Sequence, residues 1–294
     1  MRHLLLVNRR PISVRPTPSI ARTCSGRLRL PKPAARVGRS IVSSSAESPL
    51  RVVSWNLDRG RAAGAWQAVA RDHGADLVLL QEATKPQSDS VWHWDAVLPQ
   101  LWGSAVIAMD GQLQRVDVPE YRGWVIGARW SRGPKASVEE VYVFSIHSPT
   151  HHKETPRKSY VREARTIVSR INTAVPLDAP LVIGGDFNFA SLGERVDGER
   201  RATDPAEQKA LDEFRTKGFL VAWRDLHPAA PLPQTLRWTG DRTTPFHCDG
   251  YLVRGLEASR LTCEVVLNEV CDAVSDHRPV TLVYAGESSA KGAT

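Results

Sequence analysis

Six short polar motifs, each bordering an apolar run, restrict the fold of this chain more than any other feature. They read SWNLD, QE, HSP, GGDFN, CDGYL and SDHRP, in this order, between residues 54 and 279. An apolar run that stops at acidic, amide or imidazole side chains is typical of a buried strand whose end points into a crevice. The sequence therefore predicts a fold in which segments far apart in the chain share one site.

Hydrophobic periodicity predicts strands that alternate with helices. The expected strands are 50–55, 76–81, 103–109, 112–118, 123–130, 138–146, 180–184, 236–238, 251–253, 261–267 and 280–284, and the expected helices are 62–73, 156–174 and 204–217. The four successive strands between 103 and 146 predict an antiparallel meander. We predict one α/β catalytic domain over residues 47–286, a four-layer sandwich. Two mixed or antiparallel sheets would pack face to face with helices on the outside.

The formal charge of +7 comes entirely from the N-terminus. Residues 1–46 hold ten basic and no acidic side chains, whereas the other 248 residues hold 29 basic and 32 acidic ones. This composition predicts a disordered basic tail, with a transit peptide or a misassigned start codon as alternatives. Residues 287–294 are expected to form a flexible C-terminal tail. Because the body is slightly acidic, net charge alone does not indicate nucleic-acid binding.

The cysteine content excludes a disulfide framework and a structural zinc site. The chain has four cysteines and no C-x-x-C pair, so we expect reduced thiols in a soluble, intracellular monomer. A cytoplasmic location is favoured, although the basic tail also leaves import into an organelle open. No apolar run approaches the roughly 18 residues that a membrane span needs.

The motifs concentrate oxygen donors and imidazoles. Carboxylate and amide oxygens suit Mg²⁺ or Mn²⁺ better than zinc. Hydrolysis of a phosphodiester needs a neutralised phosphate, a deprotonated water and a stabilised leaving alkoxide, which a cation and two histidines can supply. The oxygen-bearing residues are Asn56, Asp58, Glu82, Asp186, Asn188 and Asp276.

The six motifs, in this order over residues 51–284, resemble the endonuclease/exonuclease/phosphatase superfamily. Its members include pancreatic-type deoxyribonucleases, apurinic-site endonucleases, neutral sphingomyelinases and inositol-polyphosphate 5-phosphatases. The resemblance implies a Mg²⁺-dependent hydrolase, with Mn²⁺ as a substitute, that cleaves phosphodiesters by in-line attack of water. A nuclease acting on nucleic acid is the favoured interpretation. The alternatives are a phosphatase or phosphodiesterase for a small or lipid phosphoester, and a catalytically inert binding module on the same fold.

The resemblance also implies a metal site. Its residues would be Asn56, Asp58, Glu82 and Asp276. Glu82 matches the main ligand of the family, and Asp58 matches an aspartate that only some branches have.

The implied catalytic residues are His147, Asp186, Asn188, Asp249 and His277. His147 matches a histidine that holds the scissile phosphate in deoxyribonuclease-like branches. Asp186 and Asn188 match a pair that positions the attacking water and the phosphate. His277 matches a general base or a phosphate-binding imidazole, and Asp249 matches its orienting carboxylate. Asp186 is the alternative general base, and the sequence leaves this choice open.

Two positions depart from the family pattern. The apurinic-site branch usually has tyrosine in place of His147, which argues against that repair activity. Gly250 stands where the family often has tyrosine, and this leaves space beside Asp249.

Several residues are candidates for substrate contacts. These are Trp92, Trp94, Lys153 and Arg157, with the two tryptophans expected on a loop. Burial of the tryptophans and a solvated helix face are the alternative interpretations. The sequence shows no long hydrophobic hairpin of the kind that would favour a membrane-lipid substrate.

Overall fold

The computed structural model describes residues 48–132, 138–149, 156–192, 205–237 and 246–286. The predicted tails, Lys153 and Trp238 lie outside these residues, so the tails and the binding role of Lys153 stay predictions. Arg157 lies within a helix whose backbone is described, but its side chain falls outside the described part. Among the described residues, no helix combines the length and apolarity needed to cross a membrane.

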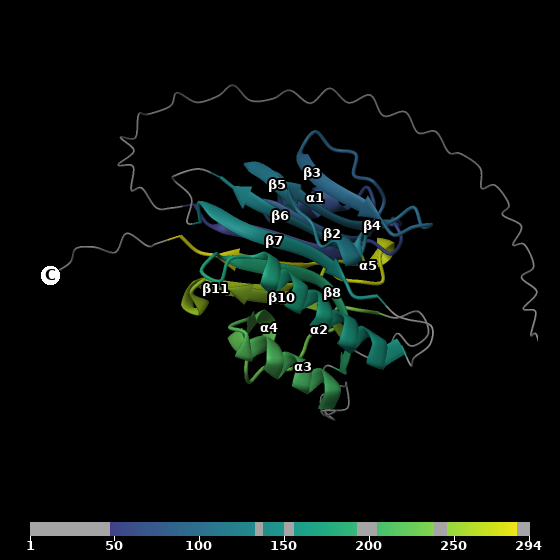
Figure 1. Ribbon diagram of the computed structural model, residues 1–294. Helices are drawn as coiled ribbons and strands as arrows, with labels where there is room; N and C mark the ends of the chain where they lie inside the picture. The colour runs from purple at the N-terminus through teal and green to yellow at the C-terminus, as the bar shows by residue number, and fades with distance from the viewer. Residues whose placement is uncertain (1–47, 133–137, 150–155, 193–204, 238–245, 287–294) are drawn as a thin grey trace, which may run out of the picture. The chain divides into compact units, whose positions relative to one another are not determined.

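Two six-stranded sheets form the centre of the described part (Figure 1). The first has the order β11-β12-β1-β2-β4-β3. Its strands are β1 (Leu50–Asn56), β2 (Leu77–Ala83), β3 (Val91–Ala96), β4 (Gly103–Ala108), β11 (Leu261–Val265) and β12 (Val280–Tyr284). The second has the order β5-β6-β7-β8-β10-β9. Its strands are β5 (Gln112–Val116), β6 (Val125–Ser131), β7 (Glu140–His147), β8 (Leu181–Leu192), β9 (Leu220–Val221) and β10 (Phe246–Arg254).

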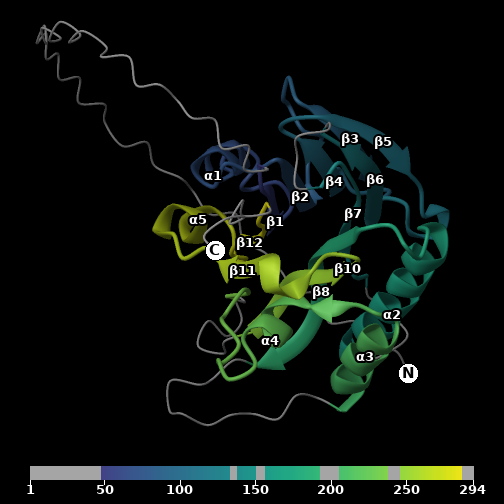
Figure 2. The same cartoon turned by 90° about the vertical axis from the view of Figure 1, so that its left-hand side faces the viewer.

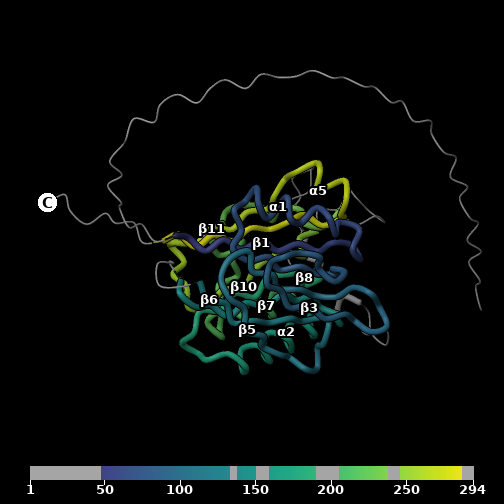
Figure 3. Tube along the Cα trace, turned by 90° about the horizontal axis from the view of Figure 1, so that it is seen from above, coloured from purple at the N-terminus to yellow at the C-terminus, as the bar shows by residue number. Residues whose placement is uncertain are grey.

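Five α-helices accompany the sheets in the described part of the chain. They are α1 (Trp66–Asp72), α2 (Pro156–Ala174), α3 (Pro205–Thr216), α4 (Ala222–Leu226) and α5 (Glu269–Val274). Helices α1 and α5 lie on the opposite side of the sheets from α2 and α3, as Figure 2 shows, and Figure 3 shows the same separation of α1 and α5 from α2. The predicted four-layer α/β sandwich is therefore confirmed.

Three apolar clusters hold the four layers together. One lies between the sheets and includes Leu79, Val143 and Leu282. The second joins α2 and α3 to the second sheet, and the third joins α1 to the first sheet. Residues Leu77–Leu80 of β2 are fully buried, because this strand is covered on both faces. Such a strand reads as a continuous apolar run and shows no alternation.

Each sheet contains one parallel pair of strands joined by a helix. The pair β1–β2 is connected through α1, and the pair β7–β8 is connected through α2. Their other neighbours in the sheets pair antiparallel. Since parallel strands end at the same edge, each sheet presents the carboxyl ends of two strands side by side.

The predicted meander is wrong at its first strand. β4 pairs with β2 and β3 in the first sheet, whereas β5, β6 and β7 are consecutive neighbours in the second sheet. The chain changes sheet at Gly111, whose φ of +86° is accessible to glycine at little cost. A turn between strands looks the same in sequence whether it closes a hairpin or connects two sheets.

Other differences concern short or edge elements. Trp92 and Trp94, expected on a loop, lie on the edge strand β3, which pairs with β4. The predicted helix 62–73 begins at Trp66, because residues 58–65 form turns. Of the predicted strand 236–238, Leu236 makes isolated bridges, and Trp238 lies outside the described residues. The predicted helices 156–174 and 204–217 are confirmed as α2 and α3, within one residue where their ends are described.

Candidate active site

A cavity of about 400 Å³ lies at the carboxyl ends of the two parallel strand pairs. Its wall includes seven of the predicted site residues: Asp58, Glu82, His147, Asp186, Asn188, Asp276 and His277. The other two lie directly behind the wall. Asn56 donates a hydrogen bond to Asp186, and Asp249 is bonded to His277. The structure therefore brings together all nine residues that were predicted to bind metal or to act in catalysis.

Strand register explains this convergence. Asn56 is the last residue of β1, and its parallel partner Gln81 directly precedes Glu82. His147 is the last residue of β7, and its parallel partner on β8 is Asp186. The first sheet thus supplies an amide and a carboxylate, and the second sheet supplies an imidazole and a carboxylate across the same cavity.

Hydrogen bonds join the two sheets at the site. Asn56 Nδ2 donates to Asp186 Oδ2 at 3.0 Å. Beneath the cavity, Gln81 Nε2 donates to Ser145 Oγ at 2.9 Å, and Ser145 Oγ donates to the Leu80 carbonyl at 2.7 Å. These groups are buried, so their pairing fixes the distance between the sheets where the functional side chains project.

Unfavourable backbone conformations gather at the same place. Among the described residues, the non-glycine positions with positive φ are Asp58 (46°), Arg59 (56°), Glu82 (48°) and Asn188 (52°). All four line the cavity. Such conformations cost about 1–3 kcal/mol each and persist where the surrounding structure enforces them, commonly at active sites.

Three carboxylates of the wall repel one another. Burial raises the pKa of Glu82, and the charge of Asp58 raises it further, against the lowering effects of His277, Asn56 and Arg59. Burial likewise raises the pKa of Asp276, and Asp58 and Glu82 add to the rise while His277 opposes it. A divalent cation among these oxygens would remove the repulsion, so the residues present fit an oxygen-coordinated metal.

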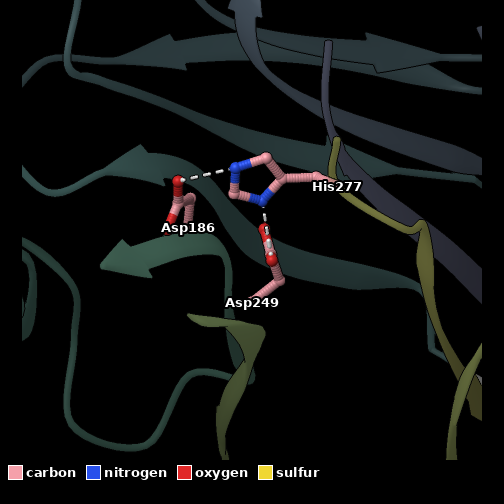
Figure 4. A group of neighbouring side chains, drawn as sticks. All are labelled: Asp186, Asp249 and His277. Atoms are coloured by element: carbon pink, nitrogen blue, oxygen red, sulfur yellow. Dashed lines mark hydrogen bonds and ion pairs between the residues drawn. The ribbon is translucent and has the colours of Figure 1, made fainter. Parts of the chain in front are cut away.

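Asp249, His277 and Asp186 form a buried row (Figure 4). His277 Nδ1 lies 2.9 Å from Asp249 Oδ2, and its Nε2 lies 3.8 Å from Asp186 Oδ2. Burial alone would lower the pKa of His277. The carboxylates of Asp249, Asp186 and Asp276 outweigh burial and raise this pKa to about 10. Backbone bonds hold the row, since the Asp249 N–H donates to Thr235 Oγ1.

Ligand atoms of this row all lie within 4.8 Å of one another, close enough to share a metal ion. His277 Nδ1 is already bonded to Asp249, however, and Asp186 accepts hydrogen bonds from Asn56 and from the Asn188 N–H. Glu82 and Asp276 offer further carboxylate oxygens in the same cavity wall.

His147 has the opposite electrostatic character from His277. Burial lowers the pKa of His147 to about 4, so its ring is neutral near pH 7. Its Nε2 lies 3.7 Å from Glu82 Oε1 and 3.8 Å from Asp186 Oδ2. Asn188 is fixed nearby, because its Nδ2 donates to the Ser148 carbonyl at 3.1 Å.

The cavity wall also contains residues that sequence reasoning missed. They are Arg59, Arg61, Trp102, Trp124, Ser148, Pro149, Tyr160 and Leu236. The two arginines directly follow the SWNLD motif and could have been found from that position. The tryptophans carry no comparable signal. Trp92 and Trp94 lie on β3 and are absent from the wall, so their predicted binding role stays a prediction.

A two-sheet sandwich with carboxylates and histidines at the ends of its parallel strands is the architecture of a class of phosphoester hydrolases. A model of the endonuclease/exonuclease/phosphatase family matches residues 53–277, and the chain belongs to this family. The chain is thus a hydrolase of the endonuclease/phosphatase type, in a family that generally depends on divalent metals. No protein with a curated description matches the sequence.

Solved structures with a similar fold include two apurinic-site (AP) endonucleases. The enzyme from Archaeoglobus fulgidus has a TM-score of 0.61 and 14% identity, covering 80% of this chain and 99% of that one. The enzyme LMAP from Leishmania major has a TM-score of 0.60 and 15% identity, covering 85% and 92%. The endonuclease domain of the telomere-specific retrotransposon TRAS1 has a TM-score of 0.54 and 17% identity, covering 81% and 98%. At these identities the likeness concerns the fold.

Proposed function

We propose that the chain is a Mg²⁺-dependent nuclease that hydrolyses phosphodiester bonds by in-line attack of water. The observation that carries the proposal is the Asp249–His277 pair, whose imidazole lines the same cavity wall as the carboxylates of Glu82 and Asp276. This arrangement places a candidate proton acceptor next to a candidate cation site, with His277 Nε2 3.9 Å from Asp276 Oδ1. The similar solved structures are described as endonucleases, and this agrees with the proposal.

We assign the cation to the first sheet and its neighbouring segments. Glu82 and Asp276 would hold it, with Asp58 and the amide oxygen of Asn56 beside them. When bound there, Mg²⁺ neutralises phosphate charge and stabilises the leaving oxygen. Mn²⁺ has the same preference for oxygen ligands and should substitute for it.

The remaining residues would handle the water and the phosphate. Asp249 holds His277 through Nδ1, which leaves Nε2 to accept a proton from water. Both oxygens of Asp186 accept hydrogen bonds, from Asn56 and from the Asn188 N–H, so we assign Asp186 a positioning role and His277 the base. A positive charge beside Asp276 would oppose protonation of the His277 ring. His147 and the Asn188 side chain would contact the phosphate.

The test is a cleavage assay of single-stranded and duplex DNA and RNA over a Mg²⁺ titration. Wild type should cleave at least one of them. Glu82→Ala should abolish activity or shift the Mg²⁺ requirement sharply upward, because it removes the main ligand. Glu140→Ala on β7 is the control, since this exposed glutamate lies outside the cavity wall. An unchanged Mg²⁺ titration for Glu82→Ala, or no cleavage by wild type, would contradict the proposal.

A lipid phosphodiester is the second candidate substrate, because the β3–β4 hairpin has an apolar tip. Leu98 and Leu101 are each 83% exposed there, one to four residues before Trp102 of the cavity wall. The tip is short, so it does not amount to the long hydrophobic hairpin whose absence the sequence indicates. Hydrolysis of sphingomyelin vesicles that falls in a Leu98→Ser/Leu101→Ser variant, without cleavage of nucleic acid, would favour this substrate. The complete set of site residues argues against an inert binding module.

A further inference from the structure

We propose that Trp102 and Trp124 form a stacking site for a nucleobase next to the scissile phosphate, so that the enzyme prefers unpaired nucleotides. The proposal rests on the nuclease function above and names the substrate form that the cavity accepts. Its basis is the position, the exposure and the fixed orientation of these two side chains.

The two indoles stand beside the phosphate-binding side of the cavity. Both line its wall together with His147 and Asn188. Their ring centroids are 5.7 Å apart at an interplanar angle of 80°. The His147 ring lies 5.1 Å from Trp124 and 5.9 Å from Trp102. A nucleotide whose phosphate contacts His147 would therefore have its base within reach of an aromatic surface.

Both tryptophans are half-buried and are held by their backbones. The Trp124 carbonyl accepts bonds from the His147 N–H at 2.8 Å and from Ser104 Oγ at 2.9 Å. The Trp102 carbonyl accepts a bond from the Val97 N–H at 2.9 Å. Because the backbones of Trp124 and His147 are hydrogen-bonded and their rings are in contact, the aromatic surface lies beside the imidazole. A rigid, preformed surface loses little conformational entropy when a ligand binds.

Three other tryptophans use their indole N–H groups in hydrogen bonds that hold the fold together. The indole N–H groups of Trp55, Trp94 and Trp130 donate to backbone carbonyls at 3.0, 2.9 and 2.7 Å. Among the described residues, the indole N–H groups of Trp102 and Trp124 have no acceptor, but the buried N–H of Trp223 has none either. What distinguishes Trp102 and Trp124 is that both rings are partly exposed in the cavity wall.

The chemistry favours an unpaired base. Every base has a π-face, so stacking on an indole tolerates all four bases and depends on access to that face. In a duplex these faces are covered by neighbouring base pairs. A single strand, or a nucleotide displaced from a duplex, can instead place its base against Trp102 or Trp124 while its phosphate lies at His147.

The test compares two oligonucleotides of equal length, one with bases and one with tetrahydrofuran residues in place of every nucleoside. Trp102→Leu and Trp124→Leu keep apolar volume but remove the indole. Each should raise KM for the base-bearing strand about ten-fold, the scale of one stacking contact. KM for the base-free strand should stay within two-fold. Tyr142→Leu is the control, because this half-buried aromatic lies on β7 outside the cavity wall.

Trp102→Phe and Trp124→Phe should recover most of the lost affinity, since phenylalanine keeps a π-face. Thermal unfolding checks that each variant is folded. Equal increases in KM on both strands, or no increase on the base-bearing strand, would overturn the stacking site. Failure of the wild type to cleave either strand would instead refute the nuclease function itself.

Discussion

Arg59 combines a disfavoured backbone conformation with a charged side chain in the cavity wall. Its φ of 56° is disfavoured for any side chain, its side chain is 71% exposed, and its Nε lies 3.7 Å from Glu82 Oε2. Arg61, also in the wall, is already paired with Asp58 at 2.7 Å. The Arg59 guanidinium is exposed and makes a longer ion pair than Arg61, so we propose that it turns to a substrate phosphate, which would explain a strained arginine where glycine would cost less.

We expect Arg59→Gly to stabilise the protein and weaken substrate binding. Relief of left-handed strain should raise the free energy of unfolding by about 1 kcal/mol. The slope of log affinity against log salt should become shallower by about one phosphate contact. Urea unfolding and salt-dependent binding of an oligonucleotide measure the two effects. Arg129→Ala, at a half-buried position on β6 outside the cavity wall, should leave the salt slope unchanged. An unchanged salt slope in Arg59→Gly would exclude the phosphate contact.

A substitution of Asp249 tests the proposal that His277 accepts a proton from water. Asp249→Asn keeps the size of the side chain but removes the charge that orients His277. We expect kcat to fall by about 10²–10⁴ with a smaller effect on KM, the range of general base catalysis. Steady-state kinetics measure this, and the exposed Asp212→Asn is the control. A near-normal kcat in His277→Ala would show that another group accepts the proton.

Sequence patterns predicted which residues carry the chemistry of the site, but they did not predict which residues surround them. Asn56, Glu82 and Asp186 could be found because each directly follows or ends an apolar run. Trp102 and Trp124 could not, because only tertiary packing decides which aromatic residue faces a cavity and which fills a core. Trp92 and Trp94 are candidates because the sequence predicts them on a loop, whereas both lie on β3 and Trp94 donates its N–H to the Ala83 carbonyl.

At the scale of the strand, a glycine on β8 allows β7 and β8 to approach closely next to the site. Gly185 on β8 has a φ of 150°, and a Cβ at this position would lie 2.0 Å from the Ile146 carbonyl oxygen. Its antiparallel partner is Gly250 on β10, where a Cβ would meet nothing within 4 Å. This open space agrees with the expectation drawn from the missing tyrosine beside Asp249.

These paired glycines give a matched experiment. Gly185→Ala should lower the free energy of unfolding by at least about 2 kcal/mol, because it combines strain with a backbone clash that separates β7 from β8. Gly250→Ala should leave stability within about 0.5 kcal/mol, as is usual for unhindered substitutions. Urea unfolding measures both. Similar losses in the two variants would mean that the spacing of β7 and β8 is not the sensitive quantity.

Elements differed in how well the sequence predicted them. Helices α2 and α3 have long apolar periodicity, and α3 has proline at its start and a glycine after its end, so their ranges were predicted closely. Strand β3 was missed because an edge strand covered on one side lacks a strong apolar run. The assignment of strands to sheets depended on contacts between residues far apart in sequence, which local patterns do not contain.

At the scale of the whole molecule, buried neutral histidines predict sensitivity to acid. Burial lowers the pKa of His247 to about 4, while its ring contacts the Pro233 carbonyl through Nδ1 at 2.9 Å. The unfolded chain takes up a proton near the ordinary pKa of about 6.5. The folded state resists that proton, so stability falls as pH drops from about 6.5 towards 4.

We expect this group to cost about 2 kcal/mol of stability between pH 7 and pH 5. His247→Gln should therefore unfold with a smaller difference between these two pH values than wild type does, even if it is less stable at pH 7. Thermal or urea unfolding at both pH values measures the difference. The exposed His73→Gln should retain the wild-type dependence on pH, and an equal dependence in His247→Gln would assign the acid sensitivity to other groups.

The division of the site between two sheets has a consequence for heat inactivation. The contacts Asn56–Asp186, Gln81–Ser145 and His277–Asp249 each connect segments of different sheets. The positions of these groups relative to one another therefore depend on the distance between the two sheets. A small thermal increase in that distance would misalign the groups while every strand stays paired. Activity should decline reversibly at temperatures below the cooperative unfolding transition, so that the working temperature is limited by the spacing of the layers before it is limited by their melting.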